Sequence, residues 1–105
     1  MTIKEIARYG ILRHLDQDQQ LNGVYVGDLA SDVLIHAPKG CLLVTMQAQP
    51  NMLAVAIACH IPAIVLSLCP DVDDELLALA RGHHLSLITT PLDSYSFLKH
   101  VGVWI

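Results

Sequence analysis

Charged residues are scarce in this sequence, and the basic ones are scattered along it. Of its 105 residues, 15% are charged and 53% are hydrophobic, whereas an average globular domain has about 25% charged residues. Lysine and arginine together number six, and the formal net charge is −4. Binding to the phosphates of a nucleic acid requires clustered lysine and arginine. The composition therefore argues against a nucleic-acid partner.

Motifs that would indicate a particular chemistry are also missing. No Gly-rich loop of the form G-x-x-x-x-G-K-[S/T] occurs, so the chain lacks the phosphate-binding loop that a kinase of that type requires. The three cysteines lie in apolar runs and form no Cys-x-x-Cys pair; they are Cys41, Cys59 and Cys69. We therefore expect reduced thiols, a cytoplasmic location, and neither a metal site nor a cofactor.

One long apolar stretch, residues 52–69, raises the question of a membrane span. His60 and Pro62 cut it into halves that are each too short to cross a bilayer and that suit a helix followed by a strand. The chain opens on a charged, helix-like segment, so no signal peptide is expected. The length is that of one domain. The excess apolar surface of the chain must lie in an unusually dry core or against a second subunit.

Strand-like and helix-like segments alternate along the whole chain. We expect helices at 2–9, 29–37, 51–60, 71–82 and 93–101, and strands at 11–15, 21–26, 41–46, 63–68 and 85–88. Asp28 is placed to cap the second of these helices. Short strands alternating with helices indicate βαβ units with right-handed crossovers. The predicted fold is therefore α/β: one small domain, residues 1–105, with a mostly parallel sheet and flanking helices.

Three stretches of the sequence together resemble the DRTGG domain. They are GVYVGDLASDVL (23–34), PKGCLLVTMQAQPNMLAVAIACHIPAIVLS (38–67) and ITTPLDSYSFL (88–98). DRTGG domains occur in CBS-containing pyrophosphatases and in phosphotransacetylases, and are similar to the N-terminal domain of HPr serine kinase/phosphatase. The resemblance implies a regulatory or structural domain without catalytic activity. In place of the namesake Asp-Arg and Thr-Gly-Gly, this chain has Gln47-Ala48-Gln49 and Ser67-Leu68-Cys69.

Polar residues occur in the loops that follow the expected strands, where ligands of parallel sheets tend to bind. The candidate ligand-binding residues are Asp28, Thr45, Gln47, Gln49, Asn51 and Ser67. The loop from Thr45 to Asn51 can donate and accept hydrogen bonds, and free N–H groups lie just beyond it at the start of a helix. The alternative is a plain corner between strand and helix, with Pro50 near the first helical position.

Other polar clusters have simple structural explanations. Asp28 and Asp32 lie four residues apart, as paired carboxylates could, but a helix cap followed by a surface aspartate explains them as well. His83 and His84 are adjacent at a helix end and point in different directions. The acidic run 71–75 lacks the spacing of a calcium loop. No pairing of a nucleophile with a base is apparent in the sequence.

Three functions remain open on these observations. The first is a non-catalytic regulatory or interaction module that forms a homodimer and acts on a partner enzyme. The second is a sensor of a small nucleotide or anion, and the third is a minor enzyme. The dimer is expected because the apolar helix 52–59 has no polar face and the tail 101–105 ends in large apolar side chains. A two-fold axis commonly covers such a surface with a second copy.

Overall fold

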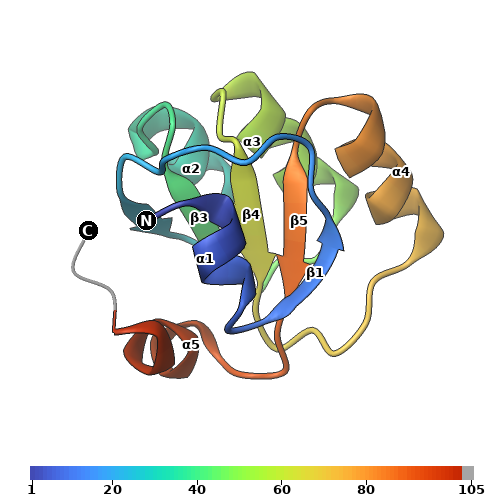
Figure 1. Cartoon of the computed structure of the whole chain (residues 1–105). Coiled ribbons are helices and arrows are strands. Elements are labelled where there is room, and N and C mark those ends of the chain that lie inside the picture. The colour runs from blue at the N-terminus through green and yellow to red at the C-terminus, as the bar shows by residue number, and fades with distance from the viewer. Residues whose placement is uncertain (103–105) are drawn as a thin grey trace.

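The computed structural model describes residues 1–102, in which a five-stranded sheet lies between two layers of helices (Figure 1). The strands are β1 (Ile11–His14), β2 (Val24–Val26), β3 (Leu42–Thr45), β4 (Ala63–Leu66) and β5 (Ser86–Thr89). Their order is β1-β5-β4-β3-β2, with β2 to β5 parallel and β1 antiparallel to β5. The predicted mostly parallel α/β sheet is confirmed.

The helices divide between the two faces of the sheet. They are α1 (Ile3–Ala7), α2 (Ala30–His36), α3 (Pro50–Ala58), α4 (Asp74–Gly82) and α5 (Ser94–Val101). Because β2 to β5 are neighbours in chain order and their crossovers share one hand, α2, α3 and α4 all lie on the same face. The short helix α1 and the last helix α5 cover the opposite face (Figure 1).

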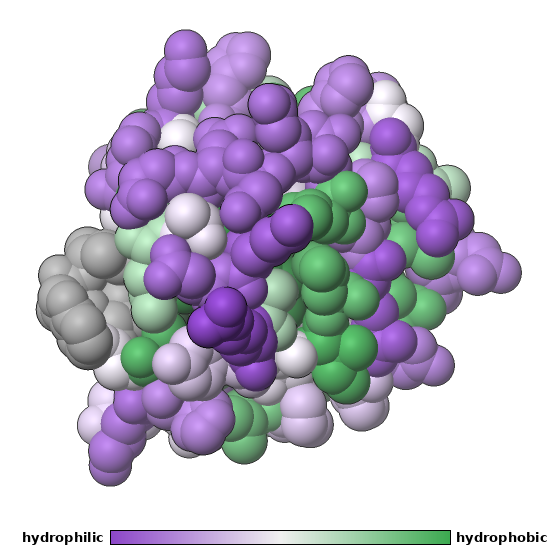
Figure 2. Space-filling view, viewed as in Figure 1, coloured by the Kyte–Doolittle hydropathy of each residue, from purple (hydrophilic) through white to green (hydrophobic). Residues whose placement is uncertain are grey.

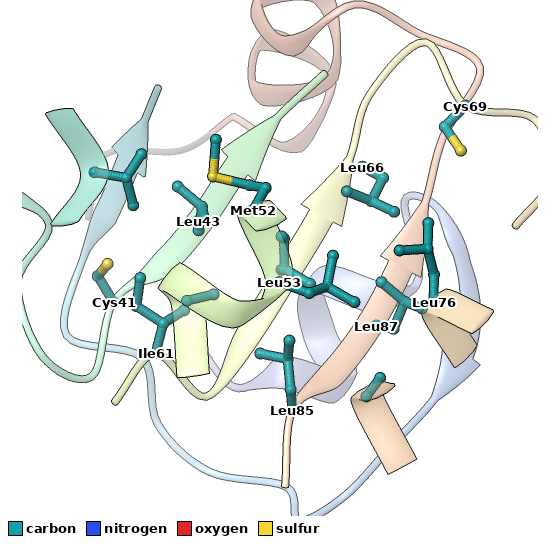
Figure 3. Close-up of a cluster of buried hydrophobic side chains, with 14 residues drawn as sticks. Cys41, Leu43, Met52, Leu53, Ile61, Leu66, Cys69, Leu76, Leu85 and Leu87 are labelled. Carbon is teal, nitrogen blue, oxygen red and sulfur yellow. The ribbon is translucent and has the colours of Figure 1, made fainter. Parts of the chain in front are cut away.

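Two hydrophobic cores result, one on each face, and the central strands contribute to both. All four residues of β3, β4 and β5 are buried, as expected for parallel strands covered on both sides. Side chains alternate between the faces: Leu43 and Leu66 point towards α2–α4 (Figure 3), whereas Leu42 and Val65 point towards α1 and α5. At the sheet edge, Ile11 and Leu12 of β1 stay 44% and 41% exposed. Figure 2 shows a strip of apolar surface in the region where Figure 1 has β1.

Several helix ends form as their local sequence predicts. Thr2 and Glu5 form a capping box, with the Thr2 hydroxyl accepting from the Glu5 backbone N–H at 3.3 Å. Asp93 caps α5 by accepting from the Ser96 backbone N–H at 2.7 Å. The acidic segment caps α4 through Asp73, so this helix begins three residues later than the sequence suggests. In all three helices the capping side chain and the backbone N–H that it binds lie three residues apart, so the sequence near each helix start is enough to predict the cap.

The apolar helix α3 is covered by its own chain, which corrects one expectation. Met52, Leu53 and Ala56 are buried against the sheet, and α2 and α4 pack on either side of α3. Within the apolar part of the helix, the exposed positions are occupied by the small residues Ala54 and Ala58, and Val55 and Ile57 are half-buried. No second subunit is therefore needed to cover this helix. Of the apolar tail, Val101 is buried, and residues 103–105 lie outside the described part of the chain.

Within residues 1–102, no helix has both the length and the apolar character required to cross a bilayer. The long apolar stretch 52–69 divides into α3 and β4, and His60 between them has a positive φ of 57°. The predicted break in this stretch is thus confirmed.

Candidate functional site

A cavity of ≈ 240 Å³ opens where β2 and β3 end. It is lined by residues of the two loops and of the starts of α2 and α3, namely Asp28, Leu29, Ala30, Gln47, Gln49, Asn51 and Met52. Four of the six predicted ligand-binding residues are among them: Asp28, Gln47, Gln49 and Asn51. They meet because β2 and β3 pair in parallel, with Val26 opposite Val44, so both strands deliver their loops to the same edge. We call this cavity the α2–α3 pocket.

Asp28 does not cap α2, and this corrects the sequence prediction. The N-cap is Leu29, which makes no side-chain capping bond. The Asp28 carboxylate instead accepts hydrogen bonds at Oδ1 from the Thr45 hydroxyl (3.0 Å) and from the Met46 backbone N–H (2.8 Å). Bonds to an ionised acceptor are stronger than neutral ones. Asp28 therefore ties the loop after β2 to the loop after β3.

Thr45 supports the pocket from below and does not line it. Its side chain is fully buried. The hydroxyl donates to Asp28 and accepts from the Gln47 backbone N–H at 3.1 Å. Thr45 is therefore a positioning residue, because it fixes both the carboxylate on one wall and the start of the polar loop on the other.

Ser67 lies at a different end of the sheet edge and takes no part in the pocket. It is buried, and its hydroxyl hydrogen-bonds that of Ser94 at 2.8 Å. The loops after β4 and β5 diverge here, because β4 leads to α4 on one face of the sheet and β5 leads to α5 on the opposite face. A crevice between such diverging loops is a common ligand site in α/β sheets. The backbone closes it: Leu68 N–H donates to the carbonyl of Leu92, and Cys69 N–H to that of Thr90.

The pocket is polar but carries only one ionisable side chain, that of Asp28. None of the described residues that line it is a lysine, an arginine or a histidine. Both helices that start at the pocket also lack a side-chain cap, whereas α1, α4 and α5 are capped by Thr2, Asp73 and Asp93. Hydrogen-bonding groups of the backbone and of the carboxamides thus remain available to a ligand.

Asp28 and Asp32 do not form a carboxylate pair. Asp32 accepts from the Tyr25 hydroxyl at 2.6 Å and lies 3.0 Å from His36 Nδ1. The hydrogen bond from Tyr25, with a smaller contribution from His36, lowers the pKa of Asp32 below its usual value. The same bond raises the pKa of Tyr25. This cluster joins β2 to α2 and holds the helix that forms one wall of the pocket.

Three other histidines gather at the opposite end of the sheet. His60, His83 and His84 line a cavity of ≈ 460 Å³ with Asp16, whose carboxylate lies 3.1 Å from His84 Nδ1. His84, like His60, has a positive φ, which ends its helix. Within residues 1–102, no three histidine, cysteine, aspartate or glutamate side chains are arranged to hold a metal ion.

Sequence reasoning missed the apolar part of the α2–α3 pocket. Leu29, Ala30 and Met52 line it beside the polar residues. Met52 is buried and belongs to the core below, and Leu29 is 65% exposed. Their only sequence signal is adjacency to the predicted polar residues, since each lies within a residue or two of Asp28 or Asn51.

Comparisons with known proteins identify the fold. No protein-family model matches the sequence, and no curated protein matches it either. One similar solved structure contains the CBS and DRTGG domains of the regulatory region of Clostridium perfringens pyrophosphatase, complexed with its activator diadenosine tetraphosphate. The TM-score is 0.77 at 15% identity, over 95% of this chain and 45% of that one. The fold is DRTGG-like, and this chain corresponds to less than half of that structure.

Proposed function

We propose that the protein is a non-catalytic regulatory module that senses a small ligand, a nucleotide or an anion, in the α2–α3 pocket. One observation carries the proposal: Asp28, Gln47, Gln49 and Asn51 come from separate segments and converge on one cavity. A plain corner between strand and helix requires only local capping. Here the corner is tied to a neighbouring loop through Asp28, which pre-forms the cavity before any ligand enters.

The similar solved structure supports a regulatory role and a nucleotide ligand. That pyrophosphatase region is regulatory and is complexed with a nucleotide activator. By analogy, a ligand bound to the present chain would change the activity of a partner enzyme that the chain contacts. The residues that line the pocket include no serine, cysteine, lysine or histidine, and their one carboxylate, Asp28, accepts hydrogen bonds from Thr45 and Met46, so no nucleophile is paired with a base there. This absence within the pocket supports a binding role.

A cytoplasmic setting forms part of the proposal. The described cysteines are all free thiols, and Cys41 and Cys69 are buried. Burial raises the pKa of both thiols, which disfavours the reactive thiolate. Reduced, inert thiols suit the reducing conditions of a cytoplasm.

A homodimer is the second part of the proposal, and α2 is the surface that favours it. Two adjacent apolar side chains of α2 are largely exposed, Leu34 at 55% and Ile35 at 74%. Large apolar side chains clustered on one surface usually mark an interface. The interface is therefore proposed on α2, because α3, the helix first expected there, buries Met52, Leu53 and Ala56 within the chain.

A thermal-shift screen of nucleotides and small anions tests ligand sensing. A ligand at about ten times its Kd stabilises the native state by about 1.4 kcal/mol, which raises the Tm of a domain of this size by roughly 5–10 °C. The double variant Gln47→Ala/Gln49→Ala should abolish this shift. Gln17→Ala/Gln19→Ala is the matched control, since it removes the same Gln-x-Gln pattern from an exposed loop elsewhere.

Two results would contradict ligand sensing in this pocket. One is a screen in which no compound raises the Tm. The other is a stabilising compound to which the Gln47→Ala/Gln49→Ala variant responds as the unaltered protein does, because the ligand would then bind elsewhere.

A further inference from the structure

The chemistry of the α2–α3 pocket narrows the class of ligand, on the premise that the proposed function holds. We infer that the pocket takes the uncharged part of a ribonucleoside, its sugar and base, and leaves any phosphate group in solvent. Three features support this: the balance of charge, the free valence of Asp28, and the three carboxamides.

The balance of charge disfavours a phosphate in the pocket. Phosphates are usually held by arginine, lysine or a bound cation, and the described lining residues include no lysine or arginine. Asp28 contributes a full negative charge there. The starts of α2 and α3 offer at most about half an elementary charge each. Together they would offset Asp28 and leave nothing to neutralise a phosphate.

Asp28 retains capacity for two donors. A carboxylate has roughly four lone-pair sites, and the Thr45 hydroxyl and the Met46 N–H occupy two of them, both on Oδ1. Oδ2 has no partner among the described residues, and Asp28 is exposed to the pocket. The neighbouring 2′- and 3′-hydroxyls of a ribose are two such donors. An acidic side chain reads the ribose hydroxyls in dinucleotide-binding folds for the same reason.

The carboxamides suit the edge of a nucleobase. Gln47, Gln49 and Asn51 each offer a donor and an acceptor side by side, and nucleobase edges present the same groups in pairs. Leu29, which is largely exposed, and Ala30 supply apolar surface for the flat face of the base. The volume of ≈ 240 Å³ is a little below the range of about 300–1,000 Å³ that holds drug-sized ligands. It suits one nucleoside.

An NMR titration of the full chain tests this inference. Amide resonances would be followed while adenosine, guanosine, cytidine or uridine is added, and then the 5′-monophosphate, the 2′-deoxynucleoside and inorganic phosphate. At least one ribonucleoside should shift the resonances of Asp28, Gln47, Gln49 and Asn51. Its monophosphate should bind within about threefold of the nucleoside. Its 2′-deoxy form should bind about tenfold more weakly or worse, because a hydrogen bond to a charged acceptor is lost.

A variant separates the role of the carboxylate from that of the fold. Asp28→Asn keeps an oxygen that can accept from Thr45 and Met46 but presents an N–H₂ donor to the sugar, so nucleoside binding should weaken about tenfold. Asp74→Asn, at an exposed position outside the pocket, should bind as the unaltered protein does. The comparison of ribonucleoside with deoxynucleoside uses unaltered protein and does not depend on the variant folding.

The outcomes distinguish the inference from the proposed function. Binding at this pocket that requires the phosphate, or that inorganic phosphate competes away, overturns the ribonucleoside inference and leaves ligand sensing in place. The absence of any shift with every compound overturns both. Shifts confined to residues outside the pocket also overturn both, because the ligand then occupies another site.

Discussion

Replacing Thr45 with valine removes the bonds that hold the pocket while keeping a β-branched side chain of similar size in β3. The buried hydroxyl donates to Asp28 at 3.0 Å and accepts from the Gln47 N–H at 3.1 Å. Each bond contributes roughly 0.5–1.5 kcal/mol, and more where the partner is charged. Asp28 is exposed, so water partly replaces the bond it loses. The gained methyl group offsets at most about 0.8 kcal/mol.

These opposing effects leave Thr45→Val less stable by about 1–2 kcal/mol. For a domain of this size the Tm should fall by roughly 5–15 °C. Urea unfolding measures the difference directly, since a fall in the midpoint at constant m-value reports stability alone. Thr45→Ser keeps the hydroxyl and loses the methyl group, so it serves as the control for packing.

A double-mutant cycle assigns the loss to the Asp28 bond. Thr45→Val and Asp28→Ala should be non-additive by about 0.5–1.5 kcal/mol, because either change alone breaks the same bond. Additive effects would show that the two side chains are not coupled. A Thr45→Val protein as stable as the unaltered one, or a Thr45→Ser protein less stable than Thr45→Val, would show that the hydrogen bonds of the Thr45 hydroxyl do not stabilise the fold.

The remaining predictions concern the dimer, the pH dependence and catalysis. Light scattering should show that Ile35→Asp on α2 converts a dimer into a folded monomer. Ala56→Glu should instead unfold the chain, because an unpaired charge at this buried position costs roughly 3–5 kcal/mol. A parent protein that is already a monomer would contradict the dimer. Because the pKa of Asp32 is lower in the folded protein than in the unfolded chain, its ionised carboxylate stabilises the fold. This stabilisation is fully present above the unfolded pKa of about 3.9 and is lost as the pH falls through the pKa of the folded state. Tyr25→Phe should therefore be less stable than the parent near pH 6 and should converge with it under acid, and an equal difference at all pH values would contradict this assignment. No ATP hydrolysis should follow the protein peak through repurification, and activity that does so would contradict a binding role.

Local sequence signals predicted most of the fold. Alternating apolar strands and helices indicated the parallel sheet, and the helices expected to start at Thr2 and Asp93 are capped by these two residues. At both caps the backbone N–H that the side chain accepts from lies three residues along the chain. The DRTGG resemblance predicted the same fold, and the solved structure agrees with it.

The candidate site was predicted less completely because its contacts depend on strand register. Asp28 lies 17 residues from Thr45, and only the pairing of β2 with β3 brings them together. Ser67 occupies a loop of the same kind, yet the loops after β4 and β5 close on each other. Ala56 lies in a helix that is apolar on every side, and periodicity alone does not reveal that α2 and α4 flank it.

A crystal structure of the chain grown with the most stabilising nucleoside would show whether the α2–α3 pocket is the ligand-binding site. We expect electron density for that ligand between the start of α2 and the start of α3. A ribose hydroxyl should lie within hydrogen-bond distance of Asp28, and the base should lie against Gln47, Gln49 or Asn51. Ligand density at any other site, with the α2–α3 pocket filled by water alone, would contradict this expectation.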